Sequence, residues 1–339
     1  MNIRDIAQIA NVSVTTVSRV LNNNPRGVGA KTRERVLKVI EEYNFSPSVM
    51  ARGMITKQTK ALGLLIPDIT DPYFAWLFRG VEDYARTQEY NVFVCNTDWN
   101  VEKELKYIKM LSEKGVDGFI FGATSCDLRE FTENVKIDKP LVSLDRRLKE
   151  LNIGGISIDH SRAGYLAASY LLAKGHRHIL FIGNGREDSA TVDRLDGFKY
   201  AHGQIRMPYR ENMVFLRKKN DNVCKRAINK LLQSPEITAC ICSGDTVALE
   251  MRKALLENQM DIPGTISLIH MGSDIVSSNL VQELTSVHEP VYQAGYDLAA
   301  LLFQAMNEPQ KRQQSLPLIL PEFKEGFTVK NLSGGSGKP

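Results

Sequence analysis

The stretch IRDIAQIANVSVTTVSRVLN, residues 3–22, decides the fold of the amino-terminal part of this chain. It predicts a helix over residues 3–10, a tight turn at residues 11–13 and a second short helix, because apolar side chains recur at helical spacing on both sides of the turn. A third helix is expected over residues 31–44 by the same spacing. Three short helices that share one apolar core predict a minimal helix-turn-helix unit over residues 1–46.

A short segment with a different character follows this unit, over residues 47–61. Pro47 ends the third helix, and residues 48–54 have the pattern of a very short helix that Gly53 weakens. A helix of this length is marginal in water, so we expect the segment to be mostly disordered until a partner orders it.

The charge of the chain is unevenly distributed. The 339 residues carry a formal net charge of +4, yet residues 1–60 alone hold ten Lys and Arg against four Asp and Glu. A small positive head on a near-neutral body suggests a polyanion as the partner of the head. A solvated basic surface without a partner is the alternative that charge alone leaves open.

Composition excludes several classes of protein. With 43% hydrophobic and 24% charged residues, the chain has the profile of a globular protein. No apolar run approaches a membrane span, and we see no export leader, so a cytoplasmic location is expected. The five cysteines have neither metal-binding nor disulfide spacing, so we expect reduced thiols, no metal and no cofactor.

From Leu62 onward, apolar strands alternate with helices in two successive series. This alternation predicts parallel sheets covered on both faces, hence an α/β body of two doubly wound lobes over residues 62–330. The first series includes a strand expected at 156–158. After the second series, a helix near residues 291–306 and strands near 317–329 must return to one or both lobes. The expected lobe boundaries are 62–159 with 290–320, and 160–288 with 321–330; residues 331–339 form a loose tail.

The ordered motifs along the chain resemble the lactose/galactose repressor (LacI/GalR) family of bacterial transcription regulators, with a weaker similarity to its gluconate-type subgroup. The head carries I-x-D-I-A-x-x-A-x-V-S-x-x-T-V-S-R-V-L-N and F-S-P-S-x-x-A-R, and the body carries G-L-L-I-P-D-I-T-D-P-Y-F, K-G-H-R-H-I-L-F-I-G and R-L-D-G-F. The resemblance implies a periplasmic-binding-protein-like body, a DNA-binding repressor that is a homodimer (a tetramer is left open), and a small carbohydrate-type effector between the lobes.

The resemblance also implies which residues contact DNA. Val14, Thr15 and Arg19 would face base edges in the major groove, where arginine can grip a guanine. The residues implied to hold phosphates are Asn2, Ser13, Thr16, Ser18 and Asn22. The segment at 48–54 matches the hinge helix of the family, whose two copies enter the minor groove with Met54 as a wedge, Ala51 at the groove floor and Arg52 near the backbone or a base. Compared with the family, Gly27 is an insertion and Gly29 replaces a serine cap.

For the effector, the resemblance implies a site at the carboxyl ends of the strands. Its candidate residues are Asp71, Tyr73, Phe74, Asp145, Arg146, Arg194, Asp245 and Asp274. The family usually has asparagine where Gly244 stands, and an acidic run near the place of Gly272. A site that loses an acid but keeps arginines favours an anion, so a sugar acid or sugar phosphate is expected over a neutral sugar. Asp274 or His288 replacing the lost acid would undo this inference.

Two other classes of function are disfavoured. An enzyme on a doubly wound fold is disfavoured because Gly183-Asn184-Gly185 lacks the third glycine of a dinucleotide fingerprint and no nucleophile motif is present, so no catalytic residue is expected. A sugar-binding protein without DNA function is disfavoured by the basic head. The remaining expectation is a regulator that works on double-stranded DNA at the bacterial nucleoid.

Overall fold

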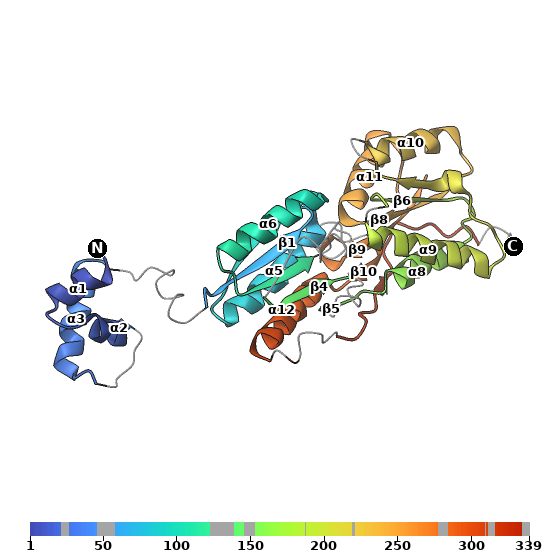
Figure 1. Ribbon diagram of the computed structural model, residues 1–339. Helices are drawn as coiled ribbons and strands as arrows, with labels where there is room; N and C mark the ends of the chain where they lie inside the picture. Colours follow the sequence, from blue (N-terminus) through green and yellow to red (C-terminus); the bar gives the residue numbers. More distant parts are fainter. Residues whose placement is uncertain are drawn as a thin grey trace. The chain divides into compact units, whose positions relative to one another are not determined.

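The computed structural model describes residues 1–21, 27–45, 58–122, 139–145, 153–186, 188–218, 221–276, 284–308, 310 and 316–333. The chain divides into two compact units, Met1–Lys60 and Ala61–Pro339 (Figure 1). The segment expected to form the hinge helix, residues 48–54, lies outside the described residues.

The head consists of α1 (Ile3–Ile9), α2 (Val14–Leu21) and α3 (Ala30–Glu42). Its core is formed by Ile6, Ala7, Ala10, Val17, Val20, Val36 and Val39. Asn2 caps α1 in a capping box with Asp5. Gly29 stands at the start of α3 without a side-chain cap, so this helix lacks the stabilisation that serine provides there.

The body begins with a five-stranded parallel sheet in the order β2-β1-β3-β4-β5. Its strands are β1 (Ala61–Ile66), β2 (Asn91–Asn96), β3 (Gly118–Gly122), β4 (Leu141–Leu144) and β5 (Gly154–Ile156). α5 (Pro72–Thr87) and α12 (Val291–Asn307) pack on one face, and α6 (Val101–Glu113) packs on the other. Alternate residues of β1 point to the two cores: Leu64 joins the first and Leu65 the second.

The second sheet has six strands in the order β11-β10-β9-β8-β6-β7. Its strands are β6 (Ile179–Gly183), β7 (Val214–Leu216), β8 (Ala239–Ser243), β9 (Ser267–Ser273), β10 (Thr285–Glu289) and β11 (Glu322–Lys324). One face carries α8 (His160–Ala173) and α9 (Ser189–Gln204), and the other carries α10 (Val223–Gln233) and α11 (Asp245–Glu257). The fold class is thus confirmed, with β11 as an antiparallel edge strand in an otherwise parallel sheet.

The chain passes between the two sheets at β5 to α8, at β10 to α12, and at α12 to β11. These crossings are tied together. Ile158 and Ile319 form a β-bridge, and the Asp159 N–H donates to the carbonyl of Ile319 at 2.9 Å. The strand expected at 156–158 therefore ends at Ile156, because the backbone beyond it turns away from β4 to pair with the third crossing.

Two helix pairs approach so closely that glycine is required at the contact. A Cβ atom on Gly80 of α5 would lie 2.1 Å from the carbonyl oxygen of Tyr292 on α12. In the second pair, a Cβ on Gly164 of α8 would lie 1.8 Å from the carbonyl oxygen of Arg194 on α9, and one on Gly197 of α9 would lie 1.8 Å from that of Ser161 on α8. These contacts fix the depth at which α9 packs on α8, and hence the position of Arg194.

Gly197→Ala should therefore destabilise the body. The added methyl group meets a backbone atom that cannot rotate away, so we expect a loss of about 1–3 kcal/mol in the free energy of unfolding. Gly203→Ala is the matched control on the same helix, because nothing lies within 4 Å of its added Cβ. That variant should be unchanged or slightly stabilised, since alanine favours a helix over glycine. Equal thermal unfolding curves for the two variants would contradict the packing argument.

Candidate nucleic-acid interface and ligand site

Helix α2 of the head has one buried face and one exposed face. Val17 and Val20 are buried against α1 and α3, whereas Val14 is 41% exposed. Thr15 and Arg19 are exposed on the same helix. An apolar residue beside a threonine and an arginine on an open helix face can contact the edges of base pairs, with the arginine supplying a donor fork.

The predicted phosphate contacts include residues that begin the first two helices. The Asn2 side chain accepts from the Arg4 N–H at 2.8 Å, and the Ser13 hydroxyl accepts from the Thr16 N–H at 3.1 Å. Helix amino-termini present free N–H groups and favour anions. Ser18 is half-buried on α2. The other predicted DNA contacts lie outside the described residues: Asn22, Ala51, Arg52 and Met54.

The inserted glycine lies beside the predicted base-reading arginine. Gly27 has a φ of +77°, a conformation that glycine adopts readily. A Cβ there would lie 2.9 Å from Nη1 of Arg19. In the sequence Gly27 is only a departure from the family in a loop, whereas the structure places it in contact with the guanidinium.

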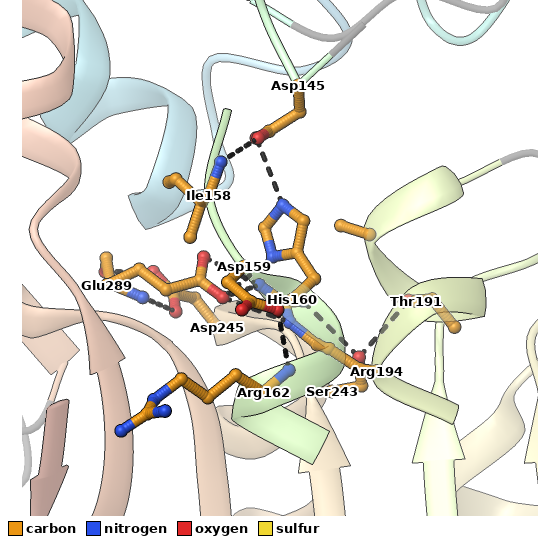
Figure 2. Close-up of polar contacts among 12 residues, drawn as sticks. Asp145, Ile158, Asp159, His160, Arg162, Thr191, Arg194, Ser243, Asp245 and Glu289 are labelled. Carbon is orange, nitrogen blue, oxygen red and sulfur yellow. Dashed lines mark hydrogen bonds and ion pairs between the residues drawn. The ribbon is translucent and has the colours of Figure 1, made fainter. Parts of the chain in front are cut away.

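In the body, buried charges form a continuous chain near the carboxyl ends of both sheets (Figure 2). The Arg194 side chain donates from Nη2 to both carboxylate oxygens of Glu289 at 2.8 Å and from Nε at 3.2 Å. Nδ1 of His160 lies 2.9 Å from Oε1 of Glu289, and its Nε2 lies 3.1 Å from Oδ2 of Asp145. We call these four residues the ionic chain: Asp145, His160, Glu289 and Arg194.

The ionic chain stabilises the charged form of each partner that shows a shift. Burial lowers the pKa of His160, but the carboxylates of Glu289 and Asp145 outweigh it and raise that pKa to about 10. Burial raises the pKa of Glu289, but the charges of Arg194 and His160 outweigh it and hold that pKa at about 2. The two carboxylates therefore favour the imidazolium form of His160, in which both ring nitrogens carry a proton.

The pairing of Arg194 bears on the expected class of effector. From the sequence, a site that loses an acid but keeps its arginines was expected to favour an anion. Arg194 is 3% exposed and its partner Glu289 is fully buried, so an acid that the sequence did not indicate is supplied from the end of β10. Arg146, the other arginine expected in the site, lies outside the described residues.

Asp71 connects the two lobes at another point. It caps α5 by accepting from the Tyr73 N–H at 3.0 Å, and its second carboxylate oxygen accepts from the Thr246 hydroxyl of α11 at 3.0 Å. Burial, followed by the charge of Asp245, raises the pKa of Asp71 to about 7. The carboxyl group therefore changes charge near neutral pH, at a contact between the lobes.

The two predicted sugar-facing aromatic residues have different environments. Phe74 is 8% exposed and lies in the core of the first lobe, with its ring edge-on to Trp99 at 6.3 Å. Its predicted contact with a sugar ring stays a prediction, and burial leaves little of the side chain exposed. Tyr73 faces the ionic chain, where burial and the carboxylates of Asp145 and Glu289 raise its phenol pKa.

Asp245 is fully buried and its oxygens are occupied. Oδ1 accepts from the Ser273 N–H at 2.8 Å and lies 2.9 Å from Nε2 of His270, while Oδ2 accepts from the Ser273 hydroxyl. A Cβ on Gly272 would lie 2.1 Å from Oδ1, so glycine is needed for this contact. His270 and Ser273 thus hold the Asp245 carboxylate in place, and neither residue was expected in the site from the sequence.

Asp274 follows β9 and is half-buried. The pKa of Asp274 is raised, because the effect of burial outweighs the opposing effects of His288 and Trp76. It lies just beyond the end of the strand and brings a further carboxyl group to the same end of the sheet; its contact with the effector stays a prediction.

Sequence reasoning missed His160, Glu289 and Thr246. His160 follows the strand expected at 156–158, and Thr246 follows Asp245 in its turn, which is the signal that could have found them. Glu289 ends β10, a strand that was not predicted from the sequence. Arg194 was found because it stands in the R-L-D-G-F motif, and Asp145 because it follows a predicted strand. Their partners come from segments far away in sequence.

Within the described parts of the chain, no group of three or more His, Cys, Asp or Glu side chains could hold a metal ion. The described helices include none that combines the length and apolar character required to span a bilayer.

Comparison with known proteins gives matches over both units. The family "Bacterial regulatory proteins, lacI family" matches residues 2–48, and "Periplasmic binding proteins and sugar binding domain of LacI family" matches residues 59–324. The HTH-type transcriptional repressor PurR of Vibrio atlanticus is 31% identical over 334 residues, which is 98% of this chain and 99% of that protein. The curated relatives are transcriptional regulators and not enzymes.

Solved structures of LacI-family regulators are also similar to this chain. A LacI family transcriptional regulator from Enterococcus faecium with bound ribose is 27% identical, has a TM-score of 0.71, and covers 80% of this chain and 99% of its own. The lac repressor dimer bound to operator and the anti-inducer ONPF has a TM-score of 0.83 at 21% identity, over 97% of this chain and 99% of its own, and so shares the fold. The present chain therefore belongs to the LacI family of bacterial regulatory proteins and is a DNA-binding transcriptional repressor with a sugar-binding domain.

Proposed function

We propose that the repressor is a homodimer whose two heads read a pseudo-palindromic operator, because a two-fold protein matches a two-fold site. The observation that carries this is the exposed face of α2, with Val14, Thr15 and Arg19 opposite the buried Val17 and Val20. Arg19 would grip a guanine, and Val14 and Thr15 would lie against a thymine methyl group.

The proposed phosphate contacts set the register of each head. Asn2, Ser13 and Thr16 stand at helix starts, where backbone N–H groups favour an anion. Ser18 and Asn22 complete the proposed set, with Ala51, Arg52 and Met54 proposed for the minor groove on the family resemblance. Because its partner is chromosomal DNA, we place the protein in the bacterial cytoplasm at the nucleoid.

We propose that the effector binds between the lobes of the body and is rich in hydroxyl groups. Asp71, Asp145, Asp245 and Glu289 lie at or near the carboxyl ends of the sheets, whereas Arg194 and His160 are each paired with acids there. The two carboxylates and the two cations of the ionic chain neutralise one another, so its guanidinium is not available to an anion, while a sugar hydroxyl can donate to Asp71. The charges of the described residues therefore support a neutral sugar, and the expectation of a sugar acid or sugar phosphate now depends on Arg146 and Arg147.

Effector binding would change DNA binding by favouring one arrangement of the lobes. A ligand shifts such an equilibrium only by its difference in affinity between the two arrangements. The Asp71–Thr246 contact joins the lobes, so a ligand that inserts there would alter the start of the body, next to the segment that leads to the head.

Arg19→Ala should weaken specific operator binding. Loss of one bidentate base contact costs about 1–3 kcal/mol and relaxes specificity at that base pair. The probe would be an operator selected from random DNA by the wild-type protein, with affinity measured by fluorescence anisotropy at fixed salt. Arg35→Ala is the matched control, because it removes the same charge from an exposed position on α3. If both variants lose specific and non-specific binding equally, Arg19 does not read bases.

A thermal-shift panel should separate the effector classes. Neutral pentoses and hexoses, their sugar acids and their phosphates would be compared at equal concentration. Saturation at 100 times Kd stabilises by about 2.7 kcal/mol, so a neutral sugar should raise the melting temperature by several degrees.

Asp71→Asn should reduce that shift, and Asp196→Asn, on the exposed side of α9, should not. A shift given by acids or phosphates alone would overturn the neutral-sugar proposal and favour the arginines at 146 and 147.

A further inference from the structure

The ionic chain lies where the polypeptide crosses between the lobes. Asp145 follows β4 of the first sheet, and His160 is the first residue of α8, just after the first crossing. Glu289 is the last residue of β10, just before the second crossing into α12. Arg194 lies on α9, which packs on the second sheet. The chain of charges therefore runs from one lobe to the other through two crossings (Figure 2).

The surrounding backbone makes this path stiff. Oδ1 of Asp145 accepts from the Ile158 N–H at 2.7 Å, so the same carboxylate holds both the first crossing and the His160 ring. The third crossing is joined to the first at Ile158 and Ile319. The second crossing is joined to the first by the contact between Glu289 and His160. A movement of Arg194 or Asp145 is therefore passed to crossings that are all connected to one another.

We propose that His160 is the positioning residue that couples Arg194, on the effector side of the second lobe, to Asp145 in the first lobe. This inference rests on the proposed function in one respect, that the effector acts near Arg194. A ligand that pulls on the guanidinium changes its hold on Glu289. The ion pair between Glu289 and His160 then changes in strength, and the imidazole ring shifts relative to Asp145. Asp145 in turn holds the first crossing through the Ile158 N–H.

The charged and titratable groups that face the chain agree with this role. They are Tyr73 on α5, Asp145 after β4, Asp188 at the start of α9 and Glu289 on β10. Because burial and the nearby carboxylates raise the pKa of Tyr73, its phenol is neutral. The His160 ring then lies between the carboxylates of Asp145 and Glu289, and the guanidinium of Arg194 is the neighbouring cation. An uncharged ring could pair with one carboxylate through its single N–H but not with both.

The protonation of His160 can be measured directly in the full chain labelled with ¹³C-histidine. Its ring should remain protonated at pH 8, because its pKa is about 10. His176 and His202 are internal controls whose pKa values burial lowers, so their rings should be neutral at that pH. A neutral His160 ring at pH 8 would overturn the proposal.

The pH dependence of stability has a definite sign. The pKa of His160 rises on folding from 6.5 to about 10, so its contribution is fully present below pH 6.5 and is lost as pH rises through 10. The difference in melting temperature between wild type and His160→Gln should therefore be largest at pH 6 and smallest at pH 10. A difference that does not vary with pH would indicate packing alone.

The coupling itself is tested by a triple-mutant box of Arg194→Lys, Asp145→Asn and His160→Gln. With His160 present, the effects of Arg194→Lys and Asp145→Asn on the melting temperature should be non-additive by about 2 to 4 °C, because the ionic chain joins these two residues. In the His160→Gln background, the two effects should add. Additivity in both backgrounds, or equal non-additivity in both, overturns the proposal.

A second measurement keeps the test decisive if Arg194→Lys does not fold. His160→Gln leaves the Asp145 carboxylate without its cation, so His160→Gln with Asp145→Asn should melt above His160→Gln alone; failure of this rescue also overturns the proposal. The thermal-shift panel tests the proposed effector separately from the test of coupling by the triple-mutant box. No shift by any sugar, with a non-additive box, would reject the proposed effector and support the coupling, and the reverse result would reject the coupling alone.

Discussion

The body of this repressor depends on the pairing of the four charges of the ionic chain, which it buries where its lobes join. Arg194 and Glu289 are almost fully removed from water, and an unpaired charge there would cost several kcal/mol. Glu289 therefore needs both Arg194 and the imidazolium of His160, and the ring in turn needs Asp145. Because these four residues come from four separate segments, their pairing holds only when both lobes and both crossings are in place.

Close helix packing sets the geometry that this pairing requires. Gly164 on α8 lies against the backbone of Arg194, and Gly197 on α9 lies against the backbone of Ser161, so neither helix can move outward without losing contact. The guanidinium is thus delivered to Glu289 by backbone contact and not by side-chain reach alone. Gly272 has a comparable role for Asp245, whose carboxylate occupies the space where a side chain would stand.

The head follows different physics from the body. Its few helices share one small core, and its information lies on the surface, at Val14, Thr15 and Arg19. Such a surface can be read from local sequence, because helical periodicity alone separates inward from outward residues. In the body, Asp71 and Asp145 were found by their place after strands, yet their partners Thr246 and His160 are distant in sequence.

Local sequence was sufficient to predict the helical head, the two doubly wound sheets and the family. These follow from periodicity, local hydrogen bonding and ordered motifs, all of which act over short distances along the chain. Only contacts between distant segments make Phe74 a core residue, engage Asp245 with Ser273, and neutralise Arg194 with Glu289. The reason is physical: whether a charged group is free or paired depends on which distant segments fold against it, and one sequence carries no local signal for that pairing.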